Sequence, residues 1–318
     1  MTQSIVRWGI LGLAKIALDQ VIPAIHLSQR GTVAAVASLS GKRLSGYGDV
    51  RHHDSYEALL ADAEVDAIYI PLPNNMHVEW TEKALRAGKH VLCEKPLAWN
   101  VAGIDRLIAA EAETGKLAAE AFMVAHHPQW DHVAGLIAQG AIGQLAHIEG
   151  VFTYFNDDAG NIRNQAALEG GALGDIGVYP VITARLATGQ EPLRASARAV
   201  MQDGVDLTTH ALLDFDGFTM SFYCSMRMIR HQFMRFHGTD GVIEVPTPFN
   251  PPDYDAARVI LRRRDESIEQ RFPTAMQYVA QADAFHASVL DNAPYPFPLS
   301  ASRANQSVLD MIRESAAG

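Results

Sequence analysis

Residues 91–97 read Val-Leu-Cys-Glu-Lys-Pro-Leu, an apolar run that ends at an acid, a lysine and a proline. An apolar run that stops at a structure-breaking residue is typical of a short buried strand. A charged pair at the end of such a strand is costly to place there unless it has a partner or a task. In an open parallel α/β sheet, ligands bind at the carboxyl ends of the strands. We therefore predict that Lys95 points into a ligand-binding crevice and that the flanking segments build that crevice.

Strands and helices are expected to alternate on both sides of this stretch. Apolar, β-rich runs occur at residues 5–11, 32–39, 67–71, 90–93 and 116–122, with helical patterns between them at 14–28, 56–60, 78–87 and 101–114. Strands and helices that alternate at this spacing predict βαβ units and a parallel sheet. We assign residues 1–122 to this first domain.

The pattern changes after residue 122. A helix is expected at residues 130–138, strands follow at 145–154, 193–201, 208–215, 218–224, 232–237, 241–245 and 258–263, and two helices come last at 278–290 and 300–315. The sequence Asp-Phe-Asp-Gly at residues 214–217, between two β-rich runs, is a hairpin signal. Strands that follow one another without helices indicate a largely antiparallel sheet. We therefore expect residues 123–318 to form an α/β domain on a largely antiparallel open sheet.

The composition narrows the classes of protein to which the chain can belong. Its 318 residues, 48% hydrophobic and 19% charged, are enough for about two globular domains. A net charge of −10 argues against nucleic acid as a partner and fits a cytoplasmic protein. No apolar run reaches the ~20 residues of a membrane span, and residues 1–7 do not resemble a secretory signal, so no membrane partner is expected. Cys93 and Cys224 are expected to be buried, reduced thiols, and no metal site is predicted.

The segment Gly9-Ile10-Leu11-Gly12-Leu13-Ala14 lies between the first strand and the first helix. Glycine lets the backbone approach a pyrophosphate, and a helix N-terminus presents N–H groups and the positive end of a dipole. The small third residue allows close packing of helix and strand. The spacing is G-x-x-G-x-A rather than G-x-G-x-x-G, so the motif alone is weak, but its place at the start of a βαβ unit favours dinucleotide binding. We predict cofactor contacts at Gly9, Gly12, Leu13 and Ala14.

The end of the second strand indicates which dinucleotide binds. NAD-binding enzymes usually carry an acid there, which binds the ribose 2′-hydroxyl. Here residues 37–43 read Ala-Ser-Leu-Ser-Gly-Lys-Arg, with two cations and no acid. An acid would repel a 2′-phosphate, whereas Arg and Lys pair with it. We therefore predict NADP, held by Ser38, Lys42 and Arg43, with NAD as the open alternative. A solvated turn with two unrelated cations would have the same sequence.

Two further segments follow predicted strands. Residues 71–77 read Pro-Leu-Pro-Asn-Asn-Met-His and should face the crevice of a doubly wound sheet. Asn side chains there can both donate and accept hydrogen bonds. We predict that Pro71, Asn74, His77 and Glu94 contact the cofactor, and that Lys95 does so too. Asn and Pro are also the usual turn residues, and His77 could instead cap the next helix.

A second polar constellation lies at residues 170–180, which read Gly-Gly-Ala-Leu-Gly-Asp-Ile-Gly-Val-Tyr-Pro. If residues 173–187 form a helix, Asp175 and Tyr179 lie on one face, because they are four residues apart. A tyrosine beside a lysine cation can exchange a proton with a carbonyl–alcohol pair. It needs such help because its ordinary pKa is about 10. Taken alone, the segment also fits a Gly-rich helix start with a packed tyrosine.

In this order and at these separations, the motifs resemble the glucose-fructose oxidoreductase / inositol dehydrogenase / MocA family along nearly the whole chain. The family's dinucleotide fingerprint is matched by residues 9–14, its Glu-Lys-Pro triplet by residues 94–96, and its D-x-G-x-[HY]-P segment by residues 175–180. Residues 120–123 and 127–129 look like the family's crossing between its two domains. The resemblance implies a Rossmann domain followed by an α/β domain whose open sheet often makes oligomer contacts. It also implies hydride transfer between a nicotinamide and a sugar or other polyol.

The resemblance implies roles for individual residues as well. Many members have His where this chain has Tyr179; the tyrosine branch resembles dimeric dihydrodiol dehydrogenase and NADP-dependent xylose dehydrogenase. In that branch the tyrosine is the acid/base and the triplet lysine, Lys95, assists it. Asp175 would orient the sugar or the Tyr–Lys pair, and Arg163 and His127 would approach the substrate. One departure is Ala125, which stands where this branch usually has an arginine.

The activity expected from these residues is that of an NADP-dependent oxidoreductase acting on an aldose or pyranose. Alternatives among enzymes are reduction of a keto-sugar, oxidation of a trans-dihydrodiol, and cleavage of glycosidic bonds through transient oxidation. A dinucleotide-binding regulator without catalysis is the alternative of another class, but such relatives tend to lose the catalytic pair, and Lys95 and Tyr179 are both present. We expect a small carbohydrate substrate and a homo-oligomer, dimer or tetramer, formed through the antiparallel sheet, whose open face needs covering.

Overall fold

The computed structural model describes residues 4–251 and 255–317, and these divide into two compact units. The first unit holds the described residues up to His126 together with Met276–Arg303. The second holds the described residues of His127–Ala275 and those from Ala304 onward. Each unit is therefore built from two separate stretches of chain, and the boundary expected at residue 122 stays a prediction.

The first unit contains a six-stranded parallel sheet in the order β3-β2-β1-β4-β5-β6. Its strands are β1 (Val6–Leu11), β2 (Gly31–Ala37), β3 (Arg51–His53), β4 (Ala67–Ile70), β5 (His90–Cys93) and β6 (Ala118–Glu120). The strand order reverses between β1 and β4, which is where doubly wound sheets bind dinucleotides. The predicted Rossmann sheet is confirmed. Strand β3 was not expected, because three residues reading Arg-His-His carry no apolar pattern.

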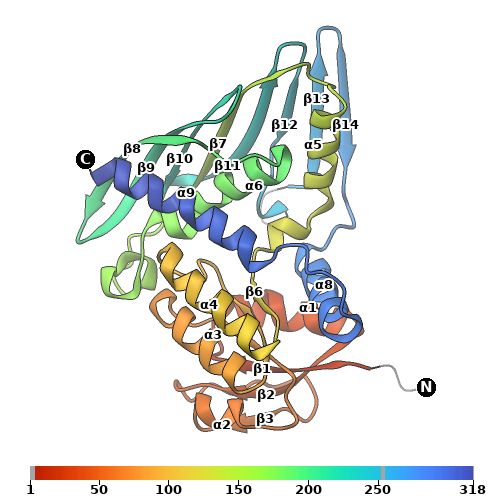
Figure 1. Cartoon of the computed structure of the whole chain (residues 1–318), viewed down its shortest axis with the longest axis vertical. Helices are drawn as coiled ribbons and strands as arrows, with labels where there is room; N and C mark the ends of the chain where they lie inside the picture. Colours follow the sequence, from red (N-terminus) through yellow and green to blue (C-terminus); the bar gives the residue numbers. More distant parts are fainter. Residues whose placement is uncertain (1–3, 252–254, 318) are drawn as a thin grey trace. The chain divides into compact units, whose positions relative to one another are not determined.

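Helices cover both faces of this sheet (Figure 1). One face carries α2 (Tyr56–Leu60), α3 (His77–Arg86) and α4 (Val101–Thr114), whose apolar side chains share one core with β1, β4 and β5. The other face carries α1 (Ile22–Leu27), which continues a π-helical turn, η1 (Ala17–Val21). It also carries α8 (Gln277–Asp291), from far along the chain.

Helix α8 is fixed to the first unit by a buried polar contact. The indole Nε1–H of Trp8 in β1 donates to Nε2 of His286 across 2.9 Å, and both side chains are completely buried. The other ring nitrogen, Nδ1, lies 3.1 Å from the hydroxyl of Ser28. An Arg30–Asp291 ion pair of 2.6 Å joins the residue before β2 to the end of α8 at the surface. The helical layer on this face of the Rossmann sheet is therefore completed by a segment that follows the second unit's sheet in the sequence.

The second unit contains an eight-stranded sheet in the order β14-β13-β12-β11-β7-β10-β9-β8. Its strands are β7 (Leu145–Phe155), β8 (Arg194–Gln202), β9 (Val205–Asp214), β10 (Thr219–Ser225), β11 (Arg227–Gly238), β12 (Val242–Val245), β13 (Arg258–Arg263) and β14 (Glu266–Arg271). Only the β7–β10 pair is parallel among the described pairings, so the predicted, largely antiparallel sheet is confirmed. The predicted hairpin at residues 214–217 joins β9 to β10.

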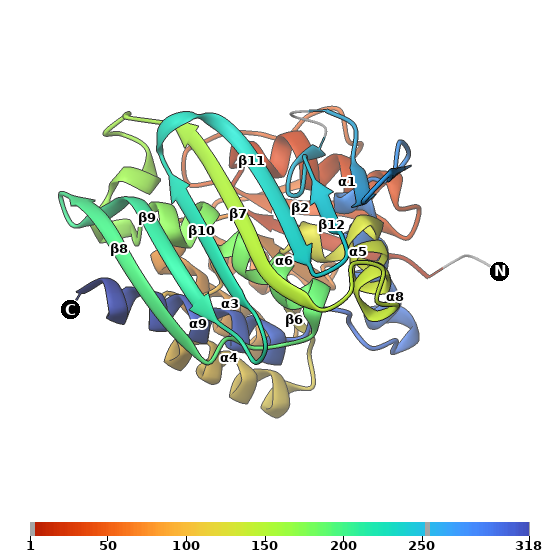
Figure 2. The same ribbon diagram turned by 90° about the horizontal axis from the view of Figure 1, so that it is seen from above.

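One face of this sheet is covered by helices. These are α5 (Pro128–Ala138), the π-helical turn η6 (Leu173–Gly177), α6 (Val178–Thr188), and the part of α9 (Leu299–Ala317) that belongs to this unit. Gly150 lets β7 pack closely on α6, because an added Cβ would lie 3.0 Å from Pro180, and Gly177 lets η6 pack closely on β10, because a Cβ there would lie 2.8 Å from Cys224. Figure 2 looks onto the opposite face, where no helix of the described chain lies.

Cys93 and Cys224 are free and buried, as predicted. None of the described helices is both long enough and apolar enough to cross a membrane.

Candidate active site

The glycine turn after β1 has the shape of a phosphate cradle. Gly12 has a φ of +90°, a conformation that favours glycine, and its N–H donates to Ala37 across 2.7 Å. A Cβ on Gly12 would lie 3.1 Å from Leu72. The helical run begins just after Ala14, and the first N–H groups of a helix have no acceptor within it. The turn therefore fits the pyrophosphate of a dinucleotide.

Gly9 lies in the strand before this turn, at a closely packed position. It lies inside β1, and a Cβ there would come within 2.6 Å of Leu59 and 2.9 Å of Ile68. Its missing side chain therefore serves the packing of the sheet. Contact of Gly9, Leu13 or Ala14 with a cofactor stays a prediction.

The end of β2 presents its two cations to solvent. Ser38 follows the strand directly, and its hydroxyl lies 3.1 Å from that of Ser40. Lys42 and Arg43 come next and are both exposed. An exposed cationic turn at this strand end is compatible with a 2′-phosphate, and its assignment to NADP stays a prediction.

The loop after β4 is fixed by a buried histidine. Pro71 is buried, and Asn74 opens a short 3-10 turn, η2 (Asn74–Met76). His77 begins α3 and is 1% exposed, with Nε2 and Nδ1 each 2.8 Å from a carbonyl oxygen, that of Leu72 and that of Pro96 respectively. The side chain of His77 does not cap α3. Both of its nitrogens are used inside the protein, although the sequence interpretation placed it against the cofactor.

The Glu-Lys-Pro triplet follows β5 at the carboxyl edge of the sheet. The N–H of Glu94 donates to Ile70 across 3.0 Å, and its carboxylate accepts the hydroxyl of Tyr69 at 2.6 Å. Burial raises the pKa of the Tyr69 phenol well above its usual value, and the Glu94 charge adds to this shift. Lys95 is half-buried, and its peptide bond to Pro96 is cis. Glu94 thus ties the turn to β4, and Lys95 projects from the next position.

Glu120, at the end of β6, holds the other side of this turn. Its Oε1 accepts the N–H of Leu97 at 2.8 Å, and the side chain is 4% exposed. Burial raises the pKa of the Glu120 carboxyl to about 7, while the N–H of Leu97, the hydroxyl of Ser302 and the charge of Lys95 act in the opposite direction. A carboxyl group therefore titrates near neutrality beneath the triplet.

In the second unit, a glycine pair precedes η6. Gly171 has a φ of +129°, and the space that its Cβ would need is taken by the carboxylate of Asp206. That carboxylate accepts the N–H of Leu173 and the hydroxyl of Thr209, both at 2.7 Å. The glycine therefore lets Asp206 bind the first N–H group of the π-helical turn that carries Asp175.

Asp175 is held by two donors on one oxygen. Its Oδ2 accepts Nε–H of Arg163 at 2.8 Å and the hydroxyl of Tyr154 at 2.7 Å. Asp175 raises the pKa of the Arg163 guanidinium, and ionisable Tyr154 and Tyr179 act in the same direction. Burial raises the pKa of the Tyr154 phenol. The structure thus groups Asp175, Arg163 and Tyr154, with Tyr179 in electrostatic range.

Tyr179 is the second residue of α6 and is 4% exposed. Its ring packs against Phe152 and Phe249, with centroid distances of 5.4 Å to each. A helix over residues 173–187 was expected, and its first turn proves to be π-helical rather than α-helical. Tyr154 was missed, although the alternation along β7 would have placed it on the same sheet face as Phe152.

His127 is the N-cap of α5. Its Nδ1 accepts the N–H of Gln129 at 3.1 Å, so a neutral ring carries its proton on Nε2. Burial lowers its pKa to about 4. Ala125 and His126 lie in a 3-10 turn of the first unit, where Nε2 of His126 is 3.1 Å from the hydroxyl of Tyr295. Capping accounts for the place of His127, and its role with substrate stays a prediction.

The predicted site residues fall into two sets. The fingerprint, the end of β2, the loop after β4 and the triplet share the carboxyl side of the first unit's sheet, and Asp175, Tyr179 and Arg163 belong to the second unit. Cooperation between Lys95 and Tyr179 stays a prediction. Within the described residues, no cluster of three His, Cys, Asp or Glu side chains could hold a metal ion.

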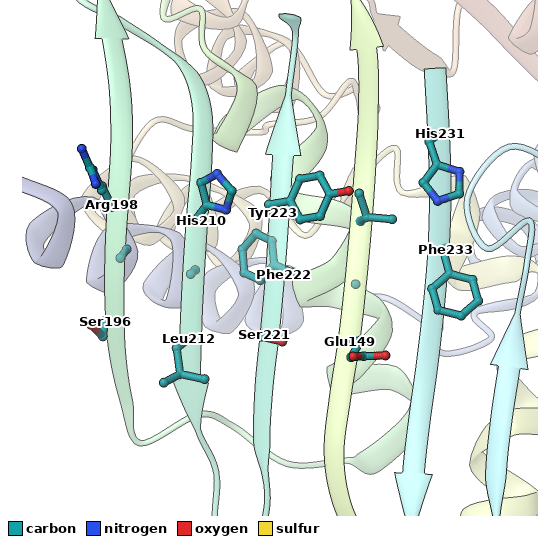
Figure 3. Close-up of a pocket in the computed structure, with 14 residues that line it drawn as sticks. Glu149, Ser196, Arg198, His210, Leu212, Ser221, Phe222, Tyr223, His231 and Phe233 are labelled. Carbon is teal, nitrogen blue, oxygen red and sulfur yellow. The ribbon is translucent and has the colours of Figure 1, made fainter. Parts of the chain in front are cut away.

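The uncovered face of the large sheet is hollowed. A hollow of about 650 Å³ is lined by residues of five strands, β7 to β11 (Figure 3). Arg198, His210 and Tyr223 stand side by side in register across β8, β9 and β10, and the rings of the last two stack with centroids 5.5 Å apart. Leu212, in the next row, is 45% exposed.

Comparison with known proteins connects these sites to a family. Residues 6–122 match the oxidoreductase family with an NAD-binding Rossmann fold, and residues 130–244 match the GFO/IDH/MocA C-terminal domain. The first match falls in the first unit and the second match in the second unit.

Relatives match over most of their length. The chain is 37% identical to a dTDP-3,4-didehydro-2,6-dideoxy-alpha-D-glucose 3-reductase from Streptomyces violaceoruber, over 89% of this chain and 85% of that one. It is 33% identical to the D-xylose 1-dehydrogenase (NADP(+)) 2 of Haloferax volcanii, over 97% of each. Among solved structures, a 3-ketoreductase from Actinomadura kijaniata in complex with NADP and TDP-benzene matches with a TM-score of 0.91 and 34% identity, over 98% of each chain.

Proposed function

The chain belongs to the Gfo/Idh/MocA family of NAD(P)-dependent oxidoreductases, and from this membership we propose that it transfers hydride between NADP and a sugar. The reacting group is the hydroxyl or carbonyl of an aldose or pyranose. The observation that carries the proposal is the segment of Asp175 and Tyr179, in which an anchored carboxylate is followed by a phenol one helical turn later. Such a pair can orient a polyol and exchange its proton.

The proposed chemistry assigns one task to each side chain. The bound nicotinamide supplies or accepts the hydride. Tyr179 exchanges a proton with the substrate oxygen, and Lys95 assists it by its positive charge. Asp175 orients the sugar, for which its double anchoring by Arg163 and Tyr154 is well suited. We expect this activity in the cytoplasm.

The preference for NADP is supported by the end of β2. Ser38, Lys42 and Arg43 offer a hydroxyl and two cations where NAD enzymes usually place an acid. Two of the relatives are described with NADP. Titration of the protein with NADPH and NADH, followed by nicotinamide fluorescence, would reveal equal affinities if this assignment is wrong.

Reduction of a keto-sugar is the second candidate. The higher identity to the 3-reductase, 37% against 33% for the xylose dehydrogenase, favours it. Both candidates use the same residues in opposite directions. A panel of free aldoses with NADP, set against nucleotide-linked keto-sugars with NADPH, separates them by the sign of the absorbance change of the nicotinamide.

We also propose a homo-oligomer, dimer or tetramer, formed through the uncovered face of the large sheet. The hollow and the exposed side chain of Leu212 leave apolar surface there. Light scattering of the purified protein would contradict the proposal if it gave the mass of one chain.

The direct test of the catalytic assignment is a pair of substitutions. Tyr179→Phe removes the proton-exchanging hydroxyl, and Lys95→Met removes the assisting charge at nearly constant volume. Each should lower turnover by roughly a hundredfold or more, with NADPH affinity nearly retained. Unchanged turnover in both variants would refute the assignment.

A further inference from the structure

The peptide group between Pro96 and Leu97 is held at both ends by buried side chains that can titrate. Its carbonyl oxygen lies 2.8 Å from Nδ1 of His77, and its N–H donates to Oε1 of Glu120 across 2.8 Å. His77 is 1% exposed and Glu120 is 4% exposed. This peptide group is the second one after Lys95, so its orientation fixes the turn from which the lysine projects.

The two side chains come from opposite sides of β5. His77 begins α3, which follows the loop after β4, and Glu120 ends β6, while the sheet order is β4-β5-β6. Backbone bonds of the sheet extend to Cys93 and Glu94, through Ala121 N–H at 2.7 Å and Ile70 C=O at 3.0 Å. Beyond that point, side chains bind the Pro96–Leu97 peptide.

The second ring nitrogen of His77 extends the contact to another loop. Nε2 lies 2.8 Å from the carbonyl oxygen of Leu72, so one imidazole bridges the loops after β4 and β5. These loops follow the neighbouring strands β4 and β5 on the carboxyl side of the sheet. A shift of either loop would therefore be transmitted to the turn that carries Lys95.

We propose that His77 and Glu120 are positioning residues, which set the direction of Lys95 by clamping the Pro96–Leu97 peptide. The inference deepens the proposed function and rests on it for its kinetic test only. In this proposal His77 supports the triplet from behind, whereas the sequence led us to expect a cofactor contact. Glu120 gains a task that the sequence motif did not indicate.

The charges around the clamp determine how it responds to pH. A neutral imidazole has one N–H and can donate to only one of its two carbonyl neighbours, whereas the imidazolium donates to both. Burial lowers the pKa of His77, the two carbonyl groups oppose this, and the positive charge of Lys95 lowers it further. Lys95 and Glu94 are the charged groups that face Glu120, and the Cys93 thiol lies near both carboxyls.

The first test follows Lys95 itself and does not depend on catalysis. The full-length protein is acetylated with a limiting amine reagent, and the modification of Lys95 is measured by peptide mass spectrometry relative to Lys83, a lysine of α3 with a 44% exposed side chain. His77→Leu and Glu120→Leu should each change the relative rate at Lys95 at least threefold. Equal rates in the wild-type protein and both leucine variants would overturn the clamp.

Isosteric variants separate the two contacts of His77. Asn places an amide near the position of Nδ1 and can still donate to Pro96, whereas Gln places it near Nε2 and can still donate to Leu72. His77→Asn should restore the wild-type labelling of Lys95 and most of kcat, and His77→Gln should restore neither. Glu120→Gln keeps an acceptor for Leu97 and should behave like His77→Asn. These conservative variants also serve if the leucine variants fail to fold.

The matched control is His286→Leu, another buried histidine of the same unit with two polar partners. It should lower stability and leave both Lys95 labelling and kcat per folded molecule unchanged. In the leucine variants of the clamp, kcat should fall at least tenfold with the KM for NADPH within threefold. A change in labelling without any turnover of sugars by the wild-type protein would support the clamp and refute the proposed function.

Discussion

The two polar constellations of this molecule are held by different kinds of interaction. In the first unit, the turn of Lys95 is clamped through a backbone peptide by His77 and Glu120, both almost completely buried. In the second unit, Asp175 is held side chain to side chain by Arg163 and Tyr154. The first arrangement depends on groups whose charge is disfavoured by burial, and the second on a pair of opposite charges.

This difference predicts different responses to mutation and to pH. Loss of a partner from the ion pair leaves a nearly buried carboxylate uncompensated, which is costly. Loss of a partner from the clamp leaves an uncharged peptide group unsatisfied, which costs less. In the clamp, burial moves the pKa of Glu120 to about 7, so its charge changes near neutrality, whereas Asp175 raises the pKa of Arg163 and keeps it charged.

The largest effect on stability is expected from Arg163→Met. Removal of one partner from a fully buried pair costs about 3–5 kcal/mol. The side chain of Arg163 is 40% exposed and that of Asp175 9% exposed, so water can compensate part of the loss. We expect a decrease of about 2–3 kcal/mol in the free energy of unfolding, measured in urea.

Its control is Arg263→Met in the same unit. Arg263 forms an ion pair of 2.6 Å with Glu266, and both side chains are more than 40% exposed. Its removal should change stability by less than about 0.5 kcal/mol. If both variants lose the same free energy of unfolding, the Arg163–Asp175 pair contributes no more than an exposed ion pair, and the contrast drawn for the second constellation is wrong.

The second effect is a pH dependence introduced by Glu120. Its pKa is 4.5 ordinarily and about 7 in the folded protein, so the folded state binds the proton more tightly. The contribution of this group is therefore fully present below pH 4.5 and is lost as the pH rises towards 7. The free energy of unfolding of Glu120→Gln, relative to that of the wild-type protein, should therefore rise by about 2 kcal/mol as the pH increases from 5 to 7.5.

Urea unfolding at several pH values gives this difference directly. Glu111→Gln is a suitable comparison, since burial raises the pKa of Glu111 too but the residue lies in α4, away from the triplet. The ratio of variant to wild-type activity should depend on pH over the same range for Glu120→Gln, and should not depend on pH for Glu111→Gln. If the difference in unfolding free energy between Glu120→Gln and the wild-type protein does not vary with pH, the carboxyl of Glu120 is ionised throughout this range. The claim that the charge of the clamp changes near neutrality would then be wrong.

The smallest effect is expected at His127. Loss of an N-cap costs about 1 kcal/mol, so His127→Ala should lower stability by that amount, while His127→Asn, which can cap equally well, should not. Thermal unfolding compares the three proteins. An increase in the KM for sugar that is shared by both variants would assign His127 to the substrate and add a further member to the second constellation.

The sequence predicted those features that depend on local patterns. Apolar runs located the buried strands, and the unpatterned strands β3 and β14 were missed because Arg-His-His and Glu-Ser-Ile-Glu-Gln-Arg present no buried face. Strand β11 was predicted only from residue 232, since residues 228–231 are exposed. The hairpin between β9 and β10 was correct because its turn residues carry the signal themselves.

The candidate residues depend on local patterns for the same reason. Lys95, Asp175 and Tyr179 were selected as candidates because their motifs are contiguous. Tyr154 and Glu120 were not, because their partners lie 21 and 23 residues away in the sequence and only the folded sheet brings them together. A buried histidine such as His77 has the same sequence signature whether it faces a ligand or two carbonyl groups.

The contact between Trp8 and His286 has a consequence for synthesis of the chain. On a ribosome, β1 emerges long before α8, because Trp8 precedes His286, which accepts the hydrogen bond of its indole, by 278 residues. Until then, one face of the nascent Rossmann sheet carries an uncovered tryptophan. A chain cut after residue 122 should therefore bind hydrophobic dyes and chaperones, and adding α8 as a separate peptide should suppress that binding.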